Sequence, residues 1–357
     1  MENVHFYFPL FDHFYIDIYI NHESVTKRRI MPRYKVIKTL GFIVVCCVLT
    51  GLLNFGLLQY NIARVNVHRI MTQKYNDIFV GTSHGLSAIN PEIVDQVTGR
   101  KSTNICMPDE HIIDSYFLVK EACRFHKPKR IIYELDPSYW STKQNDGVNS
   151  VYIYKEFPFS KVKMEYFNQK IKNMDARVTL APWFYYRNKI PQFFNTLRMK
   201  LSEPYKNYDV EPLNSGAQQY TKEGYMYQVT DPNAEKGSPN IILWNRDKIL
   251  EVEKKYFLKL VNFCKGKGIE FVVITIPVPQ ETLELHSQTF EKAHEYYKKM
   301  MEKHRIPFYD FNFINLNGFN RSIKGYLDYE GHMSGKLGNE FSKRLGGFLQ
   351  SEGAFAR

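Results

Sequence analysis

The chain has 357 residues, of which 44% are hydrophobic and 24% are charged, a composition typical of a folded protein rather than a disordered one. Lys and Arg outnumber Asp and Glu by 48 to 37, a formal net charge of +11, which favours an anionic surface or substrate. Nucleic acid is not an expected partner, because the sequence has no zinc-finger spacing, basic helix or dense arginine run.

Residues 1–38 are predicted to form a cytoplasmic tail. The first 30 of them are rich in aromatic residues and precede a second methionine, Met31, which opens a segment typical of a membrane anchor. We therefore expect residues 1–30 to be a misassigned upstream start or a loosely ordered tail, with no function of their own.

Residues 39–61 are predicted to be a transmembrane anchor. No charged residue lies between Lys38 and Arg64, and an apolar helix of roughly 20 residues spans the ~30 Å hydrocarbon core. A buried core helix is the alternative, but a soluble helix of this length would show a polar face. The basic residues before the segment predict a cytoplasmic N-terminus and an extracytoplasmic chain after about residue 62. A cleaved signal peptide is less favoured, because no small-x-small cleavage site follows.

Strand and helix patterns alternate within residues 62–357, the predicted extracytoplasmic domain. Short apolar runs, several of them next to glycine or proline, predict buried parallel strands at 77–81, 103–106, 130–135, 271–276 and 306–311. Helices are expected from about 109 to 126, after Pro108, and from 335 to 350. This alternation predicts an α/β fold with a parallel sheet and right-handed crossovers.

A long connection interrupts this alternation between about 137 and 246. It is rich in Tyr, Phe, Lys and Asn and has helical patterns around 160–174 and 185–202. A connection of this length is seldom a bare loop. We therefore predict a helical insertion that covers the carboxyl edge of the sheet.

The sequence Val80-Gly81-Thr82-Ser83-His84 follows the first predicted strand directly. Ligands of open α/β sheets bind at the carboxyl ends of strands, and a serine there can turn its backbone N–H toward a developing oxyanion. Gly-x-Ser alone is a weak motif, because many such serines only cap a helix.

A second motif, Tyr-Leu-Asp-Tyr-Glu-Gly-His-Met-Ser-Gly, starts at residue 326, just before the last predicted helix. A serine nucleophile needs a base within hydrogen-bond reach, and the base needs an orienting partner. His332 and Asp328 can supply both. A serine after the first strand and a histidine before the last helix together predict a catalytic pair.

These two motifs resemble those of the SGNH (GDSL-type) hydrolase superfamily. The closer resemblance is to its membrane-anchored DltD-like and alginate O-acetyltransferase-like branch, in which the first block often reads Gly-x-Ser-His. Similar runs also occur around Asn104, in the strand sequence after Lys127 and at Tyr309-Asp-Phe, so that the resemblance covers roughly residues 75–136 and 268–350.

The resemblance implies a flavodoxin-like three-layer α/β/α domain and a serine mechanism. Ser83 would be the acylated nucleophile, His332 the base and Asp328 its orienter. The residues expected to bind the substrate or the oxyanion are Gly81, His84, Asn104, Met107, Asp109 and Asp136. No cofactor and no metal are implied, and the histidines show no paired-ligand spacing.

Two departures from the family pattern leave alternatives open. The family usually places the aspartate three residues before the histidine, where this chain has Tyr329. Three alternatives stay open: Asp328 still reaches His332, Glu330 takes its place as the orienting carboxylate, or the enzyme works with Ser83 and His332 alone. The usual oxyanion glycine after the second strand is also missing, and Pro108 has no N–H to offer.

The leading hypothesis is a serine acyltransferase that O-acylates an extracytoplasmic polysaccharide with an acetyl or similar group. A membrane protein that delivers the acyl group would be its partner, and the anionic glycan or the lipid surface would suit the basic chain. An extracytoplasmic carbohydrate or lipid esterase is the second hypothesis. The third is an inactive scaffold with the same fold.

Overall fold

The computed structural model describes residues 33–143, 148–174, 177, 181–231 and 233–355, so the predicted tail at 1–30 lies outside the described residues. Two compact units are distinguished, residues 1–52 and 53–357. The described part of the first unit belongs to α1 (Arg33–Leu57), a helix long and apolar enough to cross a membrane.

The second unit is built on a five-stranded sheet with the order β2-β1-β3-β6-β7, in which every neighbouring pair is parallel. In chain order this is the 2-1-3-4-5 arrangement of flavodoxin-like folds. The strands are β1 (Asp77–Val80), β2 (Ser102–Asn104), β3 (Arg130–Glu134), β6 (Glu270–Thr275) and β7 (Phe308–Asp310).

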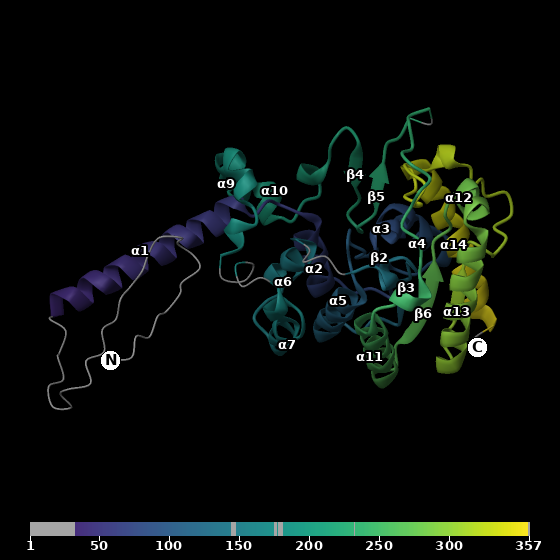
Figure 1. Cartoon of the computed structure of the whole chain (residues 1–357), viewed down its shortest axis with the longest axis horizontal. Helices are drawn as coiled ribbons and strands as arrows, with labels where there is room; N and C mark the ends of the chain where they lie inside the picture. The colour runs from purple at the N-terminus through teal and green to yellow at the C-terminus, as the bar shows by residue number, and fades with distance from the viewer. Residues whose placement is uncertain (1–32, 144–147, 175–176, 178–180, 232, 356–357) are drawn as a thin grey trace. The chain divides into compact units, whose positions relative to one another are not determined.

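Two hydrophobic cores cover the two faces of this sheet because side chains alternate along each strand. Ile131 and Tyr133 of β3 belong to one core, together with residues of α2, α5, α11 and α13. Ile132 belongs to the other core, which α4 and α14 complete. The predicted three-layer α/β/α architecture is therefore confirmed (Figure 1).

The helices of these layers have the following bounds: α2 (Ile62–Thr72), α3 (Ser83–Ala88), α4 (Pro91–Thr98), α5 (Ile112–Phe125), α11 (Glu251–Lys267), α12 (Gln280–Leu285), α13 (Ser287–His304) and α14 (Gly335–Phe355). Helix α5 starts later than predicted. Asp109 adopts a left-handed φ of 53°, which does not fit a helix, and a capping box between His111 and Asp114 begins α5 instead.

The insertion between β3 and α11 is mixed rather than only helical. Its helices are α6 (Val148–Glu156), α7 (Lys161–Gln169), α9 (Phe193–Lys200) and α10 (Glu203–Lys206). It also forms an antiparallel hairpin of β4 (Gln218–Tyr220) and β5 (Met226–Gln228), which the sequence analysis did not predict. The turn passes through Gly224, whose φ of 95° favours glycine.

Candidate active site

Ser83 lies at the carboxyl edge of the sheet, as the first residue of α3. Strand β1 ends at Val80, and Thr82 caps the helix through its side-chain oxygen, which accepts a hydrogen bond from the His84 N–H at 3.3 Å. Because the first N–H groups of a helix have no acceptor within it, the Ser83 N–H is left available by α3. The serine thus has its hydroxyl and a backbone donor at one edge.

Gly81 brings this turn close to β3. A Cβ on Gly81 would lie 2.6 Å from Glu134 Oε2 and 2.7 Å from the Glu134 backbone oxygen. A side chain here would push β1 and β3 apart beside Ser83.

We expect Gly81→Ala to lower the free energy of unfolding by about 1–3 kcal/mol because of this overpacking, and to reduce turnover by displacing Ser83. Denaturant unfolding measures the first effect. Gly216→Ala is the matched control, because no atom lies within 4 Å of the added Cβ. Equal stabilities of the two variants would show that the turn has room.

Ser83, His332 and Asp328 form a continuous hydrogen-bonded relay. The distance from Ser83 Oγ to His332 Nε2 is 2.8 Å, and that from His332 Nδ1 to Asp328 Oδ2 is 2.7 Å. The other carboxylate oxygen accepts hydrogen bonds from the Gly331 and His332 N–H groups at 3.0 and 3.2 Å. This arrangement can take a proton from the serine and stabilise the resulting imidazolium.

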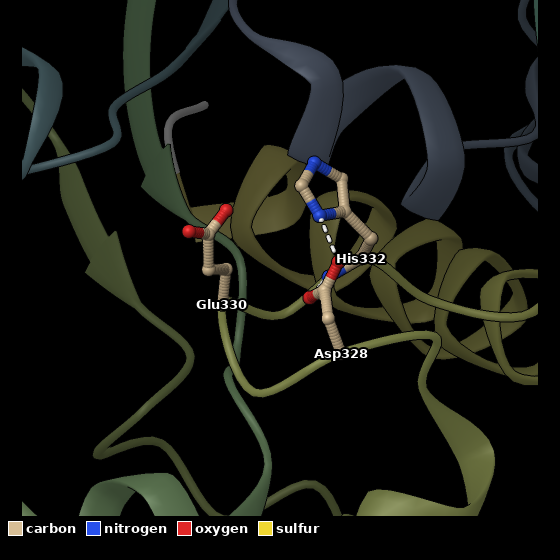
Figure 2. Close-up of side chains that lie close together, drawn as sticks. All are labelled: Asp328, Glu330 and His332. Carbon is tan, nitrogen blue, oxygen red and sulfur yellow. Dashed lines mark hydrogen bonds and ion pairs between the residues drawn. The ribbon is translucent and has the colours of Figure 1, made fainter. Parts of the chain in front are cut away.

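Asp328 reaches His332 across a spacing of four residues because the intervening chain forms a tight loop. The Leu327 N–H donates to the His332 carbonyl at 2.8 Å, and Tyr326 pairs with Met333 beside α14. Figure 2 shows Asp328 bonded to the imidazole, whereas Glu330 is not joined to it. Burial acts to raise the pKa of Asp328, but the hydrogen bond and charge of His332 outweigh it, so that the pKa is lowered.

His84 and Asp136 form a second imidazole–carboxylate pair beside the relay. His84 Nδ1 lies 2.9 Å from Asp136 Oδ2, and the His84 ring centroid lies 4.4 Å from that of His332. Burial lowers the pKa of His84, but the Asp136 and Glu134 carboxylates more than compensate and raise it to about 9. The site therefore holds a cationic imidazolium next to the reacting groups.

The protonated His84 links stability to pH. Its folded-state pKa of about 9 exceeds the ordinary 6.5, so its contribution is full below about 6.5 and is lost as the pH rises through about 9. We expect the free energy of unfolding to fall by about 3 kcal/mol across this window. Denaturant titrations at several pH values should show a shallower fall for His84→Gln. Identical pH slopes for the two proteins would contradict this role.

Glu134 lies beneath the serine turn and was not predicted as part of the site. Its Oε2 accepts hydrogen bonds from the Thr82 N–H at 2.7 Å and the Thr82 hydroxyl at 2.9 Å. Burial raises its pKa to about 7, although the charge of His84 opposes this. Its place as the last residue of β3 is the only sequence signal that could have indicated it, because residues there reach the carboxyl edge.

Two of the predicted oxyanion donors do not face the serine, which corrects the sequence analysis. Both hydrogens of the Asn104 amide go to backbone oxygens, those of Gly85 and Ile89, at 2.8 Å each. The Met107 N–H donates to the Gly81 carbonyl at 3.0 Å. These groups are used to hold the loop after β2 against the serine turn.

A cavity of about 210 Å³ opens beside the relay. Among the predicted residues it is lined by Ser83, His84, Asp109, Asp136 and His332. Ser138, which follows the same strand as Asp136, also lines it, and polar members that the sequence analysis missed include His111, Glu134, Tyr139, Lys143 and Asn312. They come from separate segments of the chain, which only the fold brings together.

One group of described residues, Asp328, Glu330 and His332, has ligand atoms within 4.8 Å of one another and the chemistry to hold a metal ion (Figure 2). Both ring nitrogens of His332 are engaged, one by Ser83 and the other by Asp328. A metal would have to break one of these bonds, so this geometry fits the relay better than a metal site.

The sequence matches no family model and no curated protein. Similar solved structures include a G-D-S-L family protein from Desulfitobacterium hafniense, with 10% identity, a TM-score of 0.36 and coverage of 76% of this chain and 98% of that chain. A GDSL-like lipase from Bacteroides thetaiotaomicron has 10% identity, a TM-score of 0.35 and coverage of 81% and 94%.

An acetyl xylan esterase from Butyrivibrio proteoclasticus has 10% identity and a TM-score of 0.30, with coverage of 81% of this chain and 66% of that chain. Similarity at this level does not indicate an activity for this chain. The resemblance to the DltD-like and alginate-acetylation-like branch stays a prediction.

Proposed function

We propose that this chain is a membrane-anchored serine acyltransferase that O-acylates an extracytoplasmic polysaccharide through an acyl-serine intermediate. The observation that carries the proposal is the relay of Ser83, His332 and Asp328, in which both contacts are at hydrogen-bond distance and Ser83 and His332 line a cavity. A scaffold without activity does not require these three side chains to be hydrogen-bonded in sequence.

In the first half-reaction, His332 takes the Ser83 proton on Nε2 as Ser83 Oγ attacks the acyl carbonyl carbon. Asp328 stabilises the imidazolium through Nδ1. The negative charge on the former carbonyl oxygen is stabilised by the Ser83 N–H and by the nearby His84 cation. His332 then gives the proton to the leaving oxygen, the bond to the donor breaks and the acyl group stays on Ser83.

In the second half-reaction, a hydroxyl of the acceptor glycan attacks the acyl-serine. His332 takes the proton of this hydroxyl and returns it to Ser83 Oγ as the new ester leaves. Water in place of the glycan gives hydrolysis by the same steps. The acceptor that reaches the acyl-serine therefore decides between transferase and esterase.

Two features support a place at the cell envelope. Helix α1 can cross a membrane, and basic residues precede its apolar part, which favours a cytoplasmic N-terminus and an extracytoplasmic site. The net charge of +11 suits an anionic glycan. Because α1 would hold the active site near the membrane, a membrane protein that delivers the acyl group could reach it.

The test follows the fate of the acyl group. The full chain, in detergent or nanodiscs, is incubated with an aryl acyl ester, with and without an anionic envelope polysaccharide. Acylated glycan that appears with the wild type and not with Ser83→Ala is the expected result. Ser83-dependent release of the free acid alone, whatever glycan is present, would favour the esterase.

A further inference from the structure

The cavity beside Ser83 has two chemically different ends, because different strands supply them. The polar end is formed after β1 and β3, where Ser83, His84 and Asp136 lie. Strand β6 lies next to β3 in the sheet, on the side away from β1. The residues that follow β6 add Ile276 and Val278 to the lining of the cavity. The cavity therefore extends from the nucleophile across the end of β3 toward an apolar wall.

A segment of the insertion completes this apolar wall. Residues 241–244 are Ile, Ile, Leu and Trp, and all four line the cavity. The start of α13 contributes three more lining residues, Thr289, Phe290 and Ala293. Of these nine residues at 241–244, 276, 278, 289, 290 and 293, eight are apolar and only Thr289 is polar. The lining also includes the polar residues Thr275 and Asn312.

Contacts at both ends hold residues 241–244 in place. On one side, His286 Nε2 donates to the Pro239 carbonyl at 3.1 Å. On the other side, the Asn245 N–H donates to Ser141 Oγ at 3.2 Å. The Trp244 ring packs against Tyr296, with the ring centroids 5.5 Å apart. The wall is thus part of the folded domain and not a bare loop.

A sugar fits these eight apolar side chains less well than an alkyl chain does, because most of its hydroxyls would lose water and face carbon. An alkyl chain gains free energy there, because its burial removes apolar surface from water. The cavity of about 210 Å³ also has more room than the two carbons of an acetyl group need.

We propose that the apolar end is a binding subsite for the alkyl chain of an acyl group longer than acetyl. This inference rests on the proposed function and names its acyl group more closely. The acyl carbonyl lies at Ser83 while the chain lies against residues 241–244 and the start of α13. The ester bond to the donor oxygen breaks, the Ser83 Oγ–carbon bond forms, and the Ser83 proton passes through His332 to the donor oxygen.

The first readout is turnover of p-nitrophenyl acetate, butyrate, hexanoate and octanoate by the full chain. We expect kcat/KM to rise by about fourfold for each added methylene until the cavity is filled. Thr289→Phe should lower the octanoate-to-acetate ratio at least tenfold, because the ring occupies the apolar end. Gln288→Phe is the matched control, since the neighbouring side chain is exposed and does not line the cavity.

The second readout does not need catalysis. Sodium octanoate, but not acetate, should change the tryptophan emission of the Ser83→Ala chain, since Trp244 lines the cavity, and Thr289→Phe should remove this change. If no ester is turned over but octanoate still binds, the proposed function fails and the alkyl subsite stands. Ser83-dependent turnover of acetate with no gain in chain length and no octanoate signal overturns the subsite alone.

Discussion

Ser83→Ala is expected to lower the turnover of an activated ester by about 10⁴- to 10⁶-fold, because the chain loses its nucleophile and can form no acyl-enzyme. His332→Ala should lose about as much, since the hydroxyl then has no base at the 2.8 Å distance that the structure shows. Steady-state hydrolysis of a p-nitrophenyl ester by the purified full chain measures both.

The double variant separates a relay from two independent contributions. Members of a catalytic relay act as a unit, so Ser83→Ala with His332→Ala should be no slower than either single variant. Unfolding curves that match the wild type control for damage to the fold. Full turnover by folded Ser83→Ala would contradict the assignment of the nucleophile.

Asp328→Asn is expected to lower kcat by about 10²- to 10⁴-fold. The amide keeps the shape of the carboxylate, but it can present an N–H to His332 Nδ1 and favour the wrong tautomer, and it cannot stabilise the imidazolium. Steady-state kcat for a p-nitrophenyl ester, measured for the wild type and for Asp328→Asn, checks this.

Glu330→Gln is the control for the assignment of the orienting carboxylate. Glu330 lies two residues from His332 but makes no hydrogen bond to it among the contacts of the described residues. Its replacement should change kcat by less than about threefold. The opposite ranking, with Glu330→Gln slow and Asp328→Asn fast, would restore the alternative that the sequence left open.

The sheet could be predicted from the sequence because its strands are short apolar runs, several of them next to glycine or proline. The run at 130–135 became β3, and that at 271–276 became β6, each shifted by one residue at most. Ser83 follows the first strand and His332 precedes the last helix, and this order along the chain allowed their pairing to be predicted. Parallel strands bring their carboxyl ends to one edge, whatever their separation in sequence.

Other parts of the site depend on tertiary contacts that local patterns do not encode. The reach of Asp328 depends on how the loop before α14 closes, and the spacing of four residues was ambiguous. The Asn104 amide was predicted to face the oxyanion, but the approach of α3 gives it two backbone acceptors instead. The apolar wall at 241–244 lies in the insertion, where the hydrophobic residues show no regular spacing that would predict its position.

An activated Ser83 should be labelled covalently by a reagent that reacts with serine nucleophiles. The intact mass of the full chain is measured after treatment with a fluorophosphonate probe, beside Ser83→Ala and His332→Ala. We predict one adduct on the wild type that both variants lose. A folded wild type that gains no adduct, or an adduct that persists in Ser83→Ala, would show that Ser83 is not the activated nucleophile.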